Sequence, residues 1–137
     1  MKFLYCLLLV FLTGLTAPAQ HSWEICLNGK TALKSTEESE EKNVLTTRTA
    51  GLNSLAVSYT EKNPKDQWER FIGLYDETDR ELAKQKGTRL KLANTALKSL
   101  LPQSGKIKIY TWALPTDPKR KAAIRVRRVH LCTLILH

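Results

Sequence analysis

KIKIYTWAL, residues 106–114, alternates charged or polar residues with β-branched and aromatic ones. A period of two is typical of a strand with one buried face. The segment 115–118, Pro-Thr-Asp-Pro, interrupts this pattern, because neither proline can donate to a strand ladder and each fixes φ for a turn. The longest β-type run of the sequence, residues 122–136, follows three basic residues. We therefore predict two long strands joined by a proline-bearing loop, a ribbon on which other strands can pair.

The first 19 residues are typical of a cleaved secretory signal peptide. Lys2 supplies a positive charge, residues 3–15 form a short apolar stretch, and Ala-Pro-Ala at 17–19 gives the small-x-small pattern before Gln20. A membrane anchor needs about 18 or more apolar residues, and Gly14 interrupts this stretch too early. We expect a single mature domain, residues 20–137, that is secreted or periplasmic and has no transmembrane segment after signal cleavage.

Two cysteines, Cys26 and Cys132, remain after cleavage, because Cys6 would leave with the signal peptide. In an oxidising compartment such a pair is first interpreted as a possible disulfide. Alternation places each cysteine off the main apolar face of its strand, and pairing requires Cα atoms within about 7 Å. The alternative is two inert, partly buried thiols. Sequence alone leaves both open.

The chain before the ribbon contains several shorter β-type segments. Asn28-Gly29 is a strong hairpin signal, because both residues tolerate positive φ. Residues 76–89 fit either a charged hairpin turn or a two-turn surface helix. The apolar spacing of 93–101 indicates a short helix that Pro102 and Gly105 end and that crosses from one sheet to the other. The predicted strands are 22–27, 31–33, 44–49, 55–60, 67–75 and 90–92.

The final run changes its apolar parity at Arg127-Arg128. A β-bulge there would restore a single buried face and would turn Arg125, Arg127 and Arg128 outward together.

These elements are best housed in a mainly β fold, an antiparallel two-sheet β-sandwich with one short crossover helix. The order of a leucine-rich helix, Gly105 and then Ile-Tyr-Thr-Trp at 109–112 resembles the approach to strand F of immunoglobulin-like domains, where a tyrosine anchors a corner. The resemblance implies an immunoglobulin-like, Greek-key arrangement. The Cys-Trp-Cys pattern of that family is absent from this sequence.

Motifs for catalysis are missing. No Gly-x-Ser-x-Gly elbow and no glycine-rich phosphate loop occurs, and paired carboxylates such as Asp76 and Asp79 lie in a solvated turn. We expect no enzyme activity and no cofactor. The alternative is a copper- or zinc-binding exported protein that uses His130, Cys132 and His137, since Cys-x4-His resembles the ligand loop of blue-copper proteins. Against it, the intervening residues look like continuous strand and the usual axial methionine is missing.

The remaining signal is a basic surface, with 22 lysines and arginines against 13 acidic residues. If the ribbon pairs as predicted, basic residues of its two strands form one patch that attracts polyanions. We therefore expect a non-catalytic binding or structural module that contacts an acidic glycan, a lipid headgroup or an acidic protein. Nucleic acid is less accessible to an exported protein. The alternative is that these charges only maintain solubility and that the ribbon's tryptophan is core. The predicted binding residues are Lys106, Lys108, Trp112, Arg125, Arg127 and Arg128.

Overall fold

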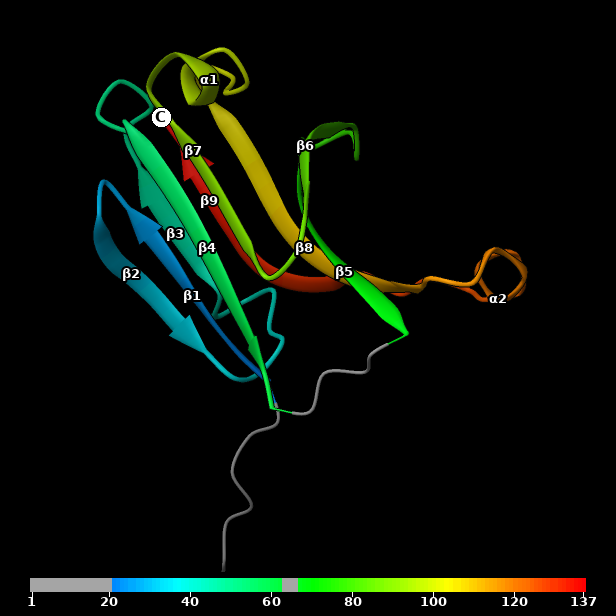
Figure 1. The fold of residues 1–137 in the computed structure, drawn as a ribbon. Helices are drawn as coiled ribbons and strands as arrows, with labels where there is room; N and C mark the ends of the chain where they lie inside the picture. The colour runs from blue at the N-terminus through cyan, green and yellow to red at the C-terminus, as the bar shows by residue number, and fades with distance from the viewer. Residues whose placement is uncertain (1–20, 63–66) are drawn as a thin grey trace, which may run out of the picture.

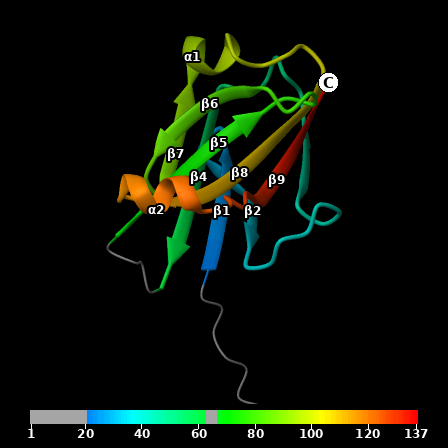
Figure 2. The same ribbon diagram turned by 90° about the vertical axis from the view of Figure 1, so that its right-hand side faces the viewer.

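The computed structural model describes residues 21–62 and 67–137. The predicted signal peptide, residues 1–19, and the turn predicted at 63–66 lie outside the described residues. The described chain is mainly β and forms two sheets, one of four strands and one of five, that pack face to face (Figures 1 and 2). The mainly β, two-sheet prediction is therefore confirmed.

The four-stranded sheet, sheet A, is antiparallel throughout and has the order β2-β1-β4-β7. Its first hairpin turns at Asn28 and Gly29, which have φ values of 54° and 79°. The Asn-Gly signal is thus confirmed, since a two-residue turn of this kind requires positive φ at both positions. The strands of sheet A are β1 (His21–Leu27), β2 (Lys30–Ser35), β4 (Ser54–Glu61) and β7 (Arg89–Ala93).

The five-stranded sheet, sheet B, has the order β3-β9-β8-β5-β6 and is mixed. β3 runs parallel to β9, with Val44 opposite Thr133, so a purely antiparallel sandwich is wrong. Parallel neighbours need a crossover connection, and here the chain between β3 and β9 supplies it. The strands of sheet B are β3 (Val44–Thr47), β5 (Trp68–Tyr75), β6 (Glu81–Lys86), β8 (Gly105–Pro115) and β9 (Val129–Leu136).

Alternate residues of both sheets fill one core between them. Ile25 and Val57 of sheet A and Ile72 and Ile109 of sheet B belong to the same buried cluster. The buried indole of Trp23 donates from Nε1 to the carbonyl of Leu131 at 2.9 Å, which ties the first strand to the last across the core. Burial of apolar surface on this scale is the main stabilising term for such a fold.

Two short helices are present in the described chain, where one was expected. α1 (Asn94–Lys98) joins β7 of sheet A to β8 of sheet B, so the crossover helix is confirmed, although it is shorter than predicted. α2 (Pro118–Ala123) lies in the loop between β8 and β9, where a turn and the start of a strand were expected. Its N-cap residue Asp117 accepts a hydrogen bond from the Lys119 amide, with Pro118 in the first turn. An aspartate followed by proline is a helix-start signal.

The final strand begins at Val129, seven residues later than predicted. Its bulge lies at Leu131 and not at Arg127-Arg128, since His130 pairs with Tyr110 and Cys132 pairs with Ile109. The extra residue lets Leu131 and Cys132 both reach the core. Arg127 and Arg128 precede the strand in a coil segment.

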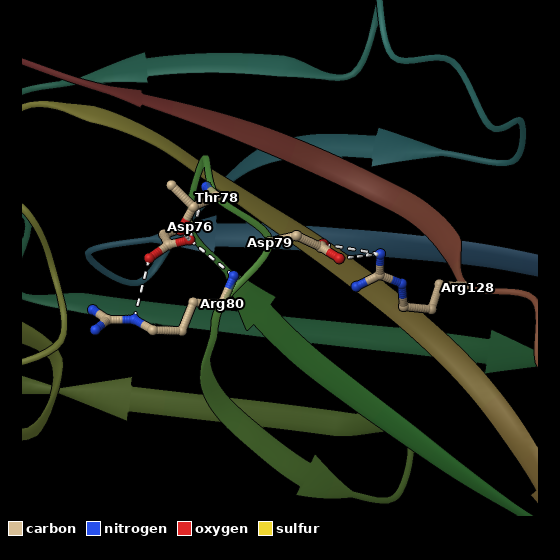
Figure 3. A network of polar contacts seen from close by, with 5 residues as sticks. All are labelled: Asp76, Thr78, Asp79, Arg80 and Arg128. Carbon is tan, nitrogen blue, oxygen red and sulfur yellow. Dashed lines mark hydrogen bonds and ion pairs between the residues drawn. The ribbon is translucent and has the colours of Figure 1, made fainter.

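The segment between β5 and β6 is a tight hairpin and not a helix. The Asp76 carboxylate accepts hydrogen bonds from the amides of Thr78 and Arg80, both at 2.9 Å (Figure 3). These bonds hold the pKa of Asp76 below its ordinary value, with the Arg80 amide as the largest cause. Asp76 therefore stabilises this turn, a common role for aspartate at such positions.

Candidate binding site

The β8–β9 connection, residues 116–128, projects from one end of the molecule, and we call it the arm (Figure 1). It has six basic residues and one acidic residue, a net charge of +5. No residue of α2 is buried. Among the described residues, Val126 is the one large hydrophobic residue that is exposed, at 41%. The arm is therefore a cationic projection with some apolar surface.

Two ion pairs hold the base of the arm. Arg127 contacts Glu38 of the β2–β3 loop at 2.8 Å. Arg128 contacts Asp79 of the β5–β6 turn at 2.9 Å, the pair drawn in Figure 3. The Arg128 guanidinium also lies over the rings of Tyr75 and Tyr110. Partial burial lowers the pKa of Arg128, but hydrogen bonds to Asp79 and Tyr75 outweigh this and raise it overall. Arg127 and Arg128 thus anchor the arm.

The predicted ribbon patch forms only in part. Lys106 pairs with Ile135 and Lys108 with Thr133, so neither lysine is opposite an arginine. Arg128 reaches the same outer face of sheet B, because it covers Tyr110, two residues from Lys108. The expected alignment fails because the arginines precede β9. Arg125 and Arg127 instead border a cleft at the end of the molecule.

Trp112, which was predicted to contact a ligand, is largely buried on the outer face of sheet B. Its ring stacks on Phe71 at 5.9 Å between centroids and lies directly over Gly73. The side chain is 8% exposed. Trp112 therefore forms part of the aromatic layer that covers this face, although it also borders the cleft beside the arm.

The cleft beside the arm, the arm cleft, has a volume of about 500 Å³. Both sheets and the arm contribute to it. Its size lies within the range of about 300–1,000 Å³ that is typical of small-molecule sites. Its aromatic and cationic lining residues include Trp23, Tyr59, Trp68, Arg70, Arg125 and Arg127.

Arg70 lies at the open end of the space between the sheets. Its guanidinium is 4.4 Å from the centre of the Tyr59 ring, and Nη1 donates to Thr111 Oγ1 at 3.1 Å. Nη2 is 3.4 Å from Glu61 Oε1, and Nε is buried without a hydrogen-bond partner. The burial of Tyr59 raises the pKa of its hydroxyl, despite the nearby arginine. This end of the core thus holds a cation whose hydrogen-bonding capacity is not fully used.

A second cleft of about 450 Å³ lies beside the β6–β7 hairpin, and we call it the hairpin cleft. It shares Trp68, Arg70 and Ala113 with the arm cleft. The two clefts are therefore neighbours that meet at Trp68 and Arg70.

Sequence reasoning missed Trp68 and Arg70 as site residues. The signal was nevertheless present, because Arg70 has the same parity as the core-facing Ile72 and Leu74 of its strand. Arg70 lies two residues after the start of its strand. An arginine that faces inward so near a strand end indicates that the core is open to solvent there.

The two cysteines are free thiols in the structure, on different sheets. Cys26 is half-buried beside Glu24 and Thr31, off the apolar face as expected. Cys132 is fully buried in the core, contrary to expectation, because the bulge at Leu131 reverses its parity. Burial raises the pKa of Cys132 to about 12, so this thiol is inert.

The residues of the metal alternative do not meet. The His130 ring contacts Tyr110 and Thr133 on the outer face of sheet B, whereas Cys132 points into the core. His137 bonds through its backbone to Thr47 and Thr49 at the other end of the strand. Within residues 21–62 and 67–137, no group of three or more potential metal ligands gathers.

Comparison with known proteins adds no further assignment. No family model matches the chain, and no curated protein is significantly similar to it. Among the described helices, none is long and apolar enough to cross a membrane.

Proposed function

We propose that this protein is a non-catalytic binding module that holds an acidic glycan through the arm. The observation that carries the proposal is the charge of the arm, six basic residues against one acidic residue on a projecting loop. Arg127 and Arg128 are held by carboxylates, but Lys119, Lys121 and Arg125 are exposed and take part in none of the ion pairs among the described residues. Such a concentration of charge attracts a polyanion and accelerates encounter with it.

An acidic glycan is favoured over other polyanions because aromatic side chains lie beside the charges. Arg120 of the arm lies 5.7 Å from the Trp68 ring centre, and Trp68 borders both clefts. Indole rings present a flat apolar surface to the C–H face of a sugar ring, while guanidinium groups bind carboxylates with two parallel hydrogen bonds. A lipid headgroup or an acidic protein uses the charges but has less need of the aromatic walls.

We further propose that the two sheets are immunoglobulin-like. The order β9-β8-β5-β6 corresponds to strands G-F-C-C′ of a variable-type domain, and β1-β4-β7 corresponds to A-B-E. Departures are the extra edge strand β2 and the lack of a described strand in place of D. On this assignment the arm is the F–G loop, one of the loops that carry recognition in variable domains. This analogy supports a binding role without identifying the ligand.

The test is a titration with polygalacturonate at low salt and at about 0.15 M salt, where the Debye length is about 8 Å. The protein is expected to bind saturably under both conditions. The double variant Lys121→Glu, Arg125→Glu is expected to weaken binding by more than about tenfold, equivalent to about 1.4 kcal/mol. A matched control, Lys30→Glu with Lys91→Glu, changes the net charge equally at exposed positions of sheet A. Equal losses in both double variants would mean that only diffuse charge is involved.

A further inference from the structure

We infer that the arm cleft and the hairpin cleft together bind two neighbouring sugar units, a uronate in the arm cleft and an uncharged sugar in the hairpin cleft. This inference rests on the proposed function and specifies which acidic glycan is recognised. It predicts a preference for chains in which charged and neutral sugars alternate.

The arm cleft is cationic. Arg70, Arg125 and Arg127 border it with one carboxylate, Glu38, which gives a net charge of +2. Glu38 is already engaged by Arg127, at 2.8 Å, and by the His130 amide, at 3.0 Å. Arg70 is likewise paired with Glu61, at 3.4 Å. Arg125 is exposed and takes part in none of the ion pairs among the described residues, so it is the cation left to meet an incoming carboxylate, and a guanidinium binds a carboxylate bidentately.

The hairpin cleft is neutral. Arg70 and Lys86 border it, and they are balanced by Glu61 and Glu69. Lys86 contacts Glu69 at 3.0 Å, so these two charges satisfy each other. A second uronate placed here would meet two carboxylates, whereas the hydroxyl and amide groups of a neutral sugar can both donate and accept. Charge complementarity therefore differs between the two clefts.

Trp68 lies at the junction, because it borders both clefts with Arg70 and Ala113. It is half-buried, and Arg120 lies over its ring at 5.7 Å. A sugar ring that rests on the indole would bring its neighbour into the other cleft. Volumes of about 500 and 450 Å³ make each cleft large enough for a single sugar unit.

The experiment measures binding of a hyaluronan tetrasaccharide, which alternates glucuronate with N-acetylglucosamine, and of its methyl ester, which lacks the charge. A galacturonate tetramer is the uniformly charged comparison. The hyaluronan tetrasaccharide is expected to bind about tenfold more tightly than either, as one charge-assisted contact is worth about that factor. Trp68→Leu is expected to weaken binding of the tetrasaccharide and its ester alike.

Arg125→Gln is the decisive variant, because Arg125 is exposed and its replacement does not threaten folding. It is expected to reduce the difference between acid and ester to less than about twofold. Lys91→Gln, which removes the same charge from an exposed position of sheet A outside both clefts, should leave that difference unchanged.

Three results would overturn the inference. The first is equal affinity for the hyaluronan tetrasaccharide and its methyl ester. The second is binding of the galacturonate tetramer as tight as that of the hyaluronan tetrasaccharide. The third is an oligoglutamate peptide that competes as well as the hyaluronan tetrasaccharide does. The last would assign the clefts to an acidic peptide. Saturable binding of long polygalacturonate with any of these results would leave the proposed function intact. If the polymer fails to bind as well, both proposals fail.

Discussion

Leu131 has no partner on β8, and this one extra residue places its two neighbours, His130 and Cys132, on opposite faces of the sheet. It puts His130 on the outer face and Cys132 in the core, although an uninterrupted strand would place both on the same face. The sequence contains no signal for the position of this bulge, because several apolar residues in a row fit either parity. The bulge predicted at Arg127-Arg128 was therefore wrong, and the metal alternative depended on the same parity.

Gly73 permits the aromatic layer on the outer face of sheet B. A Cβ atom there would lie 2.8 Å from Cη2 of Trp112 and 3.1 Å from Cε2 of Tyr75. We expect Gly73→Ala to lower the free energy of unfolding by about 1–3 kcal/mol, since the stacked rings must shift. Urea denaturation measures this change.

The matched control for that substitution is Gly51→Ala, where the added Cβ meets only the Arg48 carbonyl at 3.8 Å. It should change the free energy of unfolding by less than about 0.5 kcal/mol. If the two variants proved equally stable, the indole of Trp112 would have to be mobile rather than packed.

At the scale of elements, the strands with a clear alternation and their turns were predictable, and the connections were less so. β1, β4 and the Asn28-Gly29 turn agree closely with expectation, because local alternation and a local turn signal determine them. α2 was missed because Pro115 and Pro118 were interpreted together as a turn. The arm cleft was missed because its residues come from six separate segments, which no local pattern brings together.

α2 depends on its cap, because it buries none of its residues. We expect Asp117→Ala to reduce the ratio of helical to open conformers of residues 118–123 about fivefold, which corresponds to about 1 kcal/mol. Asp117→Asn retains a capping oxygen and should keep the helix. Cα chemical shifts report this change directly.

The melting temperature should be the same for both Asp117 variants, because α2 contributes nothing to the core. A fall in the melting temperature of Asp117→Ala alone would mean that the arm packs more firmly than its exposure indicates.

For the whole molecule, the buried His130 makes stability depend on pH. Burial lowers its pKa, against the effect of Glu40 and Glu38, so the folded protein keeps this ring neutral. In the unfolded chain the pKa returns to about 6.5, and the unfolded state then binds the proton more readily. Above about pH 6.5 the His130 ring is neutral in both states and costs no stability. As the pH falls from about 6.5 toward the lower pKa of the folded protein, the unfolded state binds the proton first and the free energy of unfolding falls.

Urea denaturation at a series of pH values from about 7.5 to 5 tests this expectation. His130→Gln keeps a polar group beside Thr133 but cannot be protonated, so its stability should fall less over the same interval. Parallel pH profiles for the two proteins would exclude His130 as the source of the dependence.

The place of β9 within sheet B also determines the order in which the fold can form. β3 has β9 as its partner, with Val44 opposite Thr133, and the Trp23 indole bonds to Leu131, 108 residues further along the chain. During synthesis, which begins at the N-terminus, the hairpin of β1 and β2 can form early. Neither the pairing of β3 nor the core around Trp23 can be completed before β9 has been made. Contacts of such sequence separation slow folding. The domain should therefore stay unfolded until nearly all of it is available, which is the state in which a chain can be threaded through a narrow channel.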